Sequence, residues 1–221
     1  MDIDAVRNKN AHDVLIQQFE QKKVDVLVGT QMVVKGLDFD DVGMVGILDA
    51  DGLLHFADFR VNERAFQLME QVSGRAGRKG EAGWVYIQTS NPNHPVLQYV
   101  ARHDYVGMYN EEIEKRKQFF YPPFSRIIHI TFKHKERDIV YAAAHQFANS
   151  IQVAYGRYMV GPADPVINRV KGLYLMELLI KLPRDANTIA RCKSEIDKQC
   201  ASLHADKRFK KVIVIPDVDA I

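Results

Sequence analysis

The chain has only two cysteines, no long apolar run and no secretory signal. Cys192 and Cys200 lie eight residues apart on one predicted helix, about 12 Å, which is farther than a disulfide tolerates. Apolar runs such as Val24–Gly29 are far shorter than the roughly 20 residues of a membrane helix. The amino terminus, MDIDAVRNKN, has no basic region leading into an apolar one. These absences predict reduced cysteines in a soluble, cytoplasmic protein without membrane contact.

The chain also lacks a strong charge of one sign and a metal-binding pattern. Thirty Lys and Arg against 28 Asp and Glu leave a formal net charge of +2, so any contact with a polyanion must come from local patches. The eight histidines are scattered without Cys-x-x-Cys or His-x-x-x-His spacing. We therefore predict no metal site in this chain.

What the chain does contain is an alternation of helix and strand patterns in its first half. With 221 residues, 47% of them hydrophobic, it can bury one core or two small ones. Helical spacing at 10–21 and 62–78 alternates with short β-branched or aromatic runs at Val24–Gly29, 44–48 and 84–89. This alternation predicts an α/β domain over residues 1–96, with a parallel sheet covered by helices and Trp84 in its core.

The second half begins after a break in the pattern. Residues 97–120 read as a charged helical connector, and Tyr121-Pro122-Pro123-Phe124 blocks its continuation because proline lacks the amide donor. Residues 121–221 then read as strand, helix and strand, twice over, which is the split βαβ or ferredoxin-like arrangement of a small α+β domain. The six predicted elements are at 127–133, 137–155, 158–161, 173–182, 186–203 and 212–215.

The sharpest local signal is the segment QVSGRAGR near the end of the predicted helix 62–78. Gln71, Arg75 and Arg78 fall at i, i+4 and i+7, on one helical face, where two arginines offer donor forks to phosphate oxygens. Gly74 and Gly77 remove side-chain bulk near a ligand, although each glycine costs roughly 1 kcal/mol in a helix. The alternative is an ordinary basic helix end capped by glycine.

A second polar segment, GTQMVVKGLDF, follows the predicted strand Val24–Gly29. At the carboxyl edge of a parallel sheet such small, hydroxyl, amide and basic groups are placed where ligands bind. Asp49 and Asp51 superficially resemble paired catalytic carboxylates, but neighbouring side chains at a strand end point apart. We expect a turn or a domain contact there.

The two polar segments together are similar to motifs V and VI of superfamily 2 helicases. The order of GTQMVVKGLDFDDV, ADGLLHFADFRVNERAFQLMEQVSGRAGR, QTSNPNHP, RKQFFYPPFSRI, GPADPVINRVKGLYLMELLIK and PDVD resembles the primosomal protein N′ family of replication-restart helicases along nearly the whole chain. The resemblance implies a partial RecA-like helicase lobe followed by an accessory domain. It also implies a 3′-to-5′ DNA helicase that hydrolyses ATP with Mg²⁺ and acts in primosome assembly.

The resemblance also implies roles for single residues. Arg78 would be the arginine finger, with Arg75 beside it and Gln71 organising the site. The remaining nucleotide-facing positions would be Gly36, Asp38, Gly74 and Gly77. The positions coupling the site to DNA would be Thr30, Gln31 and Lys35.

The chain departs from the family pattern in two ways. Leu37 stands where the family has histidine, and Asp40 where it has proline, which puts the DNA contacts of this motif in doubt. The sequence has no Gly-x-x-x-x-Gly-Lys-Ser/Thr loop, no Asp-Glu metal motif and no zinc-binding cysteine cluster. We therefore expect the carboxy-terminal part of a longer protein, with zinc only upstream, and no ATPase activity in this part alone.

The implied partners are forked and single-stranded DNA, the single-stranded DNA-binding protein, and other primosome and helicase-loading proteins. For the acidic tail of the single-stranded DNA-binding protein, Arg184 and Arg191 around the predicted helix 186–203 are candidates, since a helix amino terminus also favours anions. Arg126, Arg169 and Lys171 are either a basic patch or ordinary solvated charge. The alternative function is a stand-alone, non-catalytic module that binds protein or nucleic acid.

Overall fold

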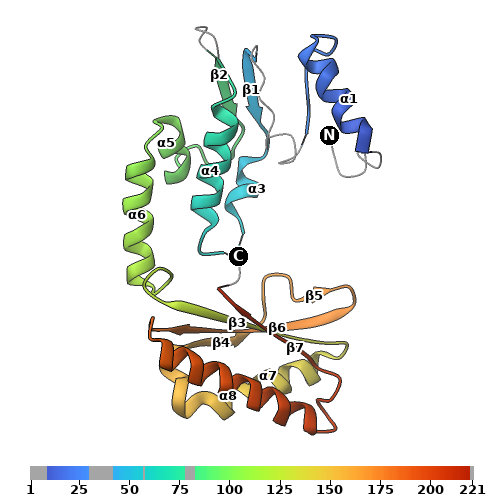
Figure 1. The fold of residues 1–221 in the computed structure, drawn as a ribbon, viewed down its shortest axis with the longest axis vertical. Coiled ribbons are helices and arrows are strands. Elements are labelled where there is room, and N and C mark those ends of the chain that lie inside the picture. Colours follow the sequence, from blue (N-terminus) through green and yellow to red (C-terminus); the bar gives the residue numbers. More distant parts are fainter. Residues whose placement is uncertain (1–8, 30–41, 57, 78–82, 220–221) are drawn as a thin grey trace. The chain divides into compact units, whose positions relative to one another are not determined.

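The computed structural model describes residues 9–29, 42–56, 58–77 and 83–219, and the chain forms two compact units (Figure 1). Unit 1 is Met1–Asn110 and unit 2 is Glu111–Ile221, with helix α6 (Tyr105–Gln118) running across the boundary. Among the described residues, no helix combines the length and apolar character needed to cross a membrane.

Unit 1 is built on two parallel strands, β1 (Met44–Ile47) and β2 (Trp84–Ile87), with Met44 opposite Trp84. Helices α3 (Ala50–Leu54) and α4 (Val61–Ser73) connect the strands, α5 (Pro95–Ala101) follows, and α1 (Lys9–Glu20) precedes them. Helix α4 buries Ala65, Phe66 and Met69 at helical spacing. The buried core of unit 1 is Ile47, Ala50, Ala65, Phe66, Met69, Val96, Leu97, Val100 and Met108.

The predicted strand at Val24–Gly29 is wrong. The structure gives these residues no strand, and Val26 and Val28 are 70% and 67% exposed. A β-branched run becomes a strand only beside a neighbour that completes its backbone hydrogen bonds. Among the described residues of unit 1, strand pairing joins β1 to β2 alone. Composition correctly predicted those two strands, but it does not reveal where a neighbour exists.

The prediction that Trp84 lies in the core is also wrong, because the side chain is 66% exposed. Successive side chains of a strand alternate between faces, so Trp84 and Tyr86 share one face while Ile87 lies on the other. Ile87 packs against the unit 1 core, whereas Trp84, Tyr86 and Met44 are exposed. Within the described residues, the helices therefore cover one face of the β1–β2 pair.

Unit 2 is an antiparallel sheet with the strand order β4-β6-β3-β7. Its elements are β3 (Arg126–His134), α7 (Arg137–Tyr155), a 3₁₀ turn (Gly156–Tyr158), β4 (Met159–Ala163), β5 (Arg169–Val170), β6 (Leu173–Leu182), α8 (Ala186–Ala205) and β7 (Ile213–Val218). The short strand β5 pairs with the start of β6. The helix predicted at 137–155 and the strand predicted at 173–182 have those bounds in the structure.

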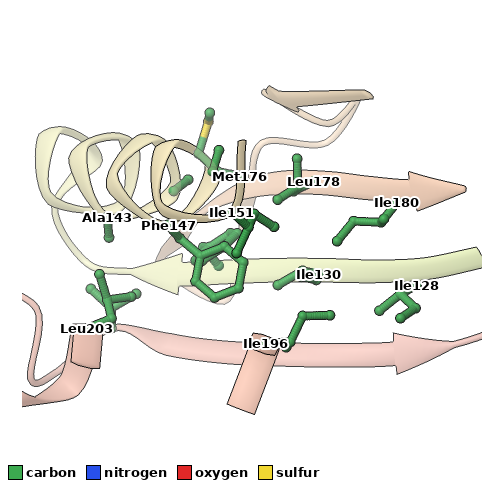
Figure 2. Close-up of a cluster of buried hydrophobic side chains, with 14 of the residues drawn as sticks. Ile128, Ile130, Ala143, Phe147, Ile151, Met176, Leu178, Ile180, Ile196 and Leu203 are labelled. Carbon is green, nitrogen blue, oxygen red and sulfur yellow. The ribbon is translucent and has the colours of Figure 1, made fainter. Parts of the chain in front are cut away.

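Helices α7 and α8 cover one face of this sheet, and the main core lies between them and the strands (Figures 1 and 2). Phe147 of α7 meets Phe132 of β3 edge to face, with ring centroids 5.4 Å apart. Ile151 of α7 and Ile196 of α8 join this cluster over Ile130. The alternating burial of β3 and β6 thus sets which face the helices cover.

Both cysteines lie on α8 and are free, as predicted. Cys192 is fully buried in the unit 2 core, and burial raises the pKa of its thiol to about 11. Cys200 is half-buried, and burial raises its pKa as well. Because the thiolate is the reactive form, both residues act as packing groups.

Candidate functional site

The arginine-bearing segment does not continue helix α4. The helix ends at Ser73, where the Gly74 amide donates to the Glu70 carbonyl at 2.9 Å. The Arg75 amide then donates to Val72 at 3.0 Å, three residues back, which is a tighter turn than the α-helix makes. The predicted helix 62–78 is therefore too long, and the predicted helical face shared by Gln71 and Arg75 ends before Arg75. The physical reason is the low helix preference of the glycines.

Gly77 fixes the segment that follows α4 to the start of β1. Its amide donates to the Val42 carbonyl at 3.0 Å, and its φ of 73° lies in the left-handed region that favours glycine. A Cβ added at Gly83 would come within 2.2 Å of the Gly77 nitrogen, so the backbones are in close contact there. The carboxyl end of α4 therefore lies at the amino edge of the two parallel strands.

Gly74 differs from Gly77 because the fold itself does not require a glycine there. Its φ is −65°, and an added Cβ would meet the Glu70 carbonyl at 3.4 Å, an ordinary contact. Packing therefore gives no reason for a glycine at position 74. The role predicted for Gly74, leaving room for a ligand, stays a prediction. Gly77, by contrast, is favoured by its left-handed backbone conformation.

The carboxyl edge of the same strands carries a network that the sequence reading missed. Asp51, in α3 after β1, accepts hydrogen bonds from the Ser90 amide at 2.7 Å and from the hydroxyls of Ser90 and Thr89 at 2.6 Å. These bonds, that of the Ser90 hydroxyl foremost, lower the pKa of Asp51 to about 2. Asp49 caps α3 by accepting from the Gly52 amide at 3.2 Å. A turn or a domain contact was predicted for these two aspartates; Asp49 caps helix α3, and Asp51 joins that helix to the residues after β2.

The other predicted positions of this site are only partly described. Gln71 is exposed and Arg75 half-buried, and both make interactions. Arg78, and all of Thr30, Gln31, Lys35, Gly36 and Asp38, lie outside the described residues. Arg75, on the glycine turn, fits one contribution to a nucleotide site, a contact to phosphate oxygens. The sequence offers no phosphate-binding loop, and the described residues hold no cluster of three metal-ligating side chains.

In unit 2, the structure separates the two candidate arginines. Arg191 of α8 lines a shallow hollow of about 370 Å³, together with residues of α7. The remaining lining residues are Ser150, Ile151, Val153, Ala154, Tyr155, Ser194 and Glu195. Arg184 instead donates to the Pro123 carbonyl at 3.4 Å. The two guanidinium groups therefore occupy different surroundings.

The amino terminus of α8 is occupied by the chain's own carboxylate. Asp185 accepts from the Thr188 amide at 2.7 Å, and hydrogen bonding to Thr188 lowers the pKa of Asp185. The helix amides that we expected to help bind an acidic tail beside Arg184 thus already have an anionic partner. Arg191 lines the hollow described above, and Arg184 is not among its lining residues.

Comparison with known families identifies both halves of the chain. The Helicase conserved C-terminal domain matches residues 2–80, which include both helicase-like segments, and the Primosomal protein N C-terminal domain matches residues 117–221. The helicase match makes unit 1 part of a RecA-like lobe, so the α/β prediction for this half holds. The second match covers nearly all of unit 2.

Named relatives agree with these matches. The chain is 38% identical over 199 residues to Replication restart protein PriA of Bacillus subtilis, covering 89% of this chain and 25% of the relative. The corresponding protein of Synechocystis is 41% identical over 189 residues, covering 82% of this chain and 22% of the relative. That of Chlamydia muridarum is 35% identical over 225 residues, covering all of this chain and 29% of the relative. The chain thus spans about a quarter of the length of these relatives. It belongs to the primosomal protein N′ family, that of the replication restart protein PriA.

Proposed function

We propose that this chain supplies the nucleotide-facing end of the second motor lobe, and the accessory domain, of an ATP-dependent 3′-to-5′ DNA helicase in replication restart. The observation that carries the proposal is the glycine turn after α4, held to the amino edge of the strands by Gly77 and Val42. The turn leads directly into Arg78. Membership of the family supports the assignment to replication restart.

In this proposal Arg78 acts as an arginine finger. Phosphoryl transfer places charge on the equatorial oxygens of the transferred group, and a positioned arginine is worth roughly 10³–10⁵ in rate. Arg75 would add a second cation, and Gln71, in the last turn of α4, would orient the pair. Gly36, Asp38, Gly74 and Gly77 would complete this side of the nucleotide site, and Thr30, Gln31 and Lys35 would couple it to the DNA strand. ATP and Mg²⁺ would be held mainly by residues outside this chain.

We further propose that unit 2 is a ferredoxin-like accessory domain. The support is the element order, strand-helix-strand twice over, with β3 and β6 as the central pair of the antiparallel sheet and β4 and β7 outside them. The whole protein would recognise forked and single-stranded DNA and help other primosome proteins load a replicative helicase. It would do so in the cytoplasm.

The decisive test of the catalytic proposal uses the full-length protein that contains this chain. Arg78→Ala should lower DNA-stimulated ATP turnover by roughly two to five orders of magnitude and leave ATP and DNA binding largely intact. Arg78→Lys should restore little, because it lacks the planar donor fork. Arg102→Ala, at an exposed arginine of the same unit, is the matched control and should keep the parental rate. Parental turnover in Arg78→Ala would refute the finger.

The 221-residue chain by itself should hydrolyse no ATP, since it carries a finger without a phosphate-binding loop. DNA-stimulated turnover of the purified chain that Arg78→Ala abolishes would contradict this proposal. A reading frame without an upstream phosphate-loop motif would instead favour the alternative, a stand-alone module that binds nucleic acid or protein without catalysis.

We propose that the acidic tail of the single-stranded DNA-binding protein binds in the hollow between α7 and α8 that Arg191 lines. A labelled tail peptide, titrated at low and high salt, should bind more weakly to Arg191→Ala than to Lys193→Ala, an exposed neighbour on α8. Arg184→Ala should have the smaller effect, because Arg184 already bonds to the Pro123 carbonyl. Equal binding by all three variants would remove the hollow from the proposal.

A further inference from the structure

The positive charge of unit 2 is concentrated in three turns. Residues 133–138, 164–172 and 206–211 hold nine Lys and Arg against four Asp and Glu, an excess of five in a chain whose formal net charge is only +2. The rest of the whole chain therefore carries a formal charge of −3. We call these nine cations the basic end: Lys133, Lys135, Arg137, Arg169, Lys171, Lys207, Arg208, Lys210 and Lys211.

Strand pairing brings the three turns to one end of the sheet. Arg169 of β5 lies opposite Tyr174 of β6, and Tyr174 lies opposite His134 at the end of β3. Lys133 of β3 lies opposite Ile213 at the start of β7, directly after the 206–211 turn. Three strand spacings separate β5 from β7, so the basic end spans about 14 Å. Figure 1 shows the β5 hairpin, the β3–α7 turn and the α8–β7 turn at this end of unit 2.

Five of these nine cations form no ion pair within the described fold. Arg137 pairs with Asp164 at 3.1 Å, and Arg208 pairs with Asp206 at 2.7 Å. Lys135, Lys171, Lys207, Lys210 and Lys211 are exposed and make no ion pair with any described residue. Arg126, grouped with Arg169 and Lys171 in the sequence reading, lies at the opposite end of β3 and pairs with Asp219.

The lysines of the 206–211 turn stand on a fixed support. Phe209 and Val212 are each 2% exposed and belong to the core. The Val212 amide donates to the Phe209 carbonyl at 2.9 Å, and His204 bonds to the Val212 carbonyl at 2.9 Å. Lys210 and Lys211 are thus presented by an ordered turn, which lowers the entropic cost of binding.

We propose that the basic end binds the phosphate backbone of duplex DNA. Duplex DNA carries one charge per roughly 1.7 Å of axis, so a surface about 14 Å wide meets several phosphates at once. Of Phe, Tyr and Trp, the three turns contain only Phe209, which is buried, and the neighbouring half-buried Tyr174 has the guanidinium of Arg169 over its ring at 4.9 Å. The turns therefore offer no exposed Phe, Tyr or Trp ring on which the bases of a single strand could stack. Contacts to phosphate alone carry no sequence information. The inference rests on the proposed function for its assumption that DNA is the polyanion encountered.

The test measures binding of the 221-residue chain to a fluorescent duplex of about 20 base pairs as salt is raised. The variant Lys207→Gln/Lys210→Gln/Lys211→Gln removes three cations of the basic end. Its matched control, Lys117→Gln/Lys193→Gln/Lys198→Gln, removes the same charge from exposed positions elsewhere in unit 2. Circular dichroism melts should show both variants folded, since all six side chains are exposed.

The basic-end variant should reduce the slope of log affinity against log salt by about two to three, at roughly 0.9 per lost phosphate contact, and weaken binding near 0.1 M salt by about tenfold or more. The control should change affinity less than about twofold. Equal losses in the two variants, or none in either, would overturn the proposal. Tighter binding of a single strand, or of a polyglutamate peptide of equal charge, with the same variant dependence would overturn the choice of duplex DNA. The binding is measured without ATP, so this result is independent of the ATPase result.

Discussion

The two units differ in how their described residues support the candidate functional residues. Among the described residues, unit 2 joins 18 buried residues in one core and unit 1 joins nine, and the exposed face of β1 and β2 carries Met44 and Trp84. In unit 1 the candidate catalytic segment follows a glycine cap and is held by the bond from Gly77 to Val42. In unit 2 one of the three turns of the basic end, 206–211, is anchored in the core through Phe209 and the following Val212. The comparison contrasts a candidate catalytic segment held by backbone hydrogen bonds with lysines on a turn that packs into a core.

The difference in packing predicts the largest effect on stability. Phe147→Ala removes a fully buried ring that packs on Phe132, and should destabilise unit 2 by about 3–5 kcal/mol. Trp84→Ala removes a larger but mostly exposed side chain, and should cost less than about 1 kcal/mol. Urea unfolding followed by circular dichroism compares the two. A greater loss from Trp84→Ala would mean that the exposed face is covered in solution.

The two glycines of the turn sharpen the comparison within unit 1. Gly77→Ala places a side chain at φ 73° and should cost about 1–2 kcal/mol in thermal unfolding. Gly74→Ala meets only an ordinary contact, and should be neutral or stabilise by up to about 1 kcal/mol. If Gly74→Ala nevertheless lowers ATP turnover in the full-length protein, the absence of a side chain at position 74 leaves room for the nucleotide. The reverse order of stabilities would contradict the geometry of the turn.

The Asp51 network should make the stability of unit 1 depend on pH in the acid range. Because the pKa of Asp51 is lowered to about 2, its contribution is present above the ordinary value of 3.8 and is lost as pH falls towards 2. Asp51→Asn should flatten the loss of unit 1 stability between those values. Thr89→Val/Ser90→Ala, which removes the hydroxyl donors, should flatten the same window. An unchanged pH profile in both variants would rule out this network as the cause.

The smallest expected effect concerns how the stability of unit 2 changes with pH near neutrality. The hydrogen bond from His129 to Glu177, 3.4 Å away, raises the pKa of His129. A raised value means that the contribution is complete below 6.5 and is lost as pH rises through the folded value. Glu177→Gln should reduce this loss in equilibrium unfolding measured across neutral pH. A variant as pH-sensitive as the parent would show that another group titrates.

The sequence predicted the parts of the fold that are decided locally. Helix 137–155 and strand 173–182 have strong periodicity, and their bounds agree with the structure. The predictions of a strand at Val24–Gly29 and of a core position for Trp84 were wrong, because composition does not show whether another strand or helix lies alongside. The five-residue helix α3 and the two-residue strand β5 are too short for a periodic signal.

The candidate site shows the same limit. The sequence motif around Arg78 sufficed to recognise the helicase segment. It did not predict the hydrogen bond from Gly77 to Val42, because that bond joins residues far apart in sequence. The bonds from Thr89 and Ser90 to Asp51 become evident only once β1 is known to lie beside β2. The basic end likewise depends on strand pairing between distant turns.

The proposed assignment of catalysis to unit 1 and of duplex binding to unit 2 is tested most directly by ATP turnover of the full-length protein. Turnover is measured as a function of duplex DNA concentration. Arg78→Ala should lower the maximal rate by two or more orders of magnitude, as a lost arginine finger does, with the half-saturating DNA concentration unchanged. Lys207→Gln/Lys210→Gln/Lys211→Gln should raise the half-saturating concentration by about tenfold, with the maximal rate unchanged. If both variants changed the same parameter, the assignment of catalysis to unit 1 and of duplex binding to unit 2 would be contradicted.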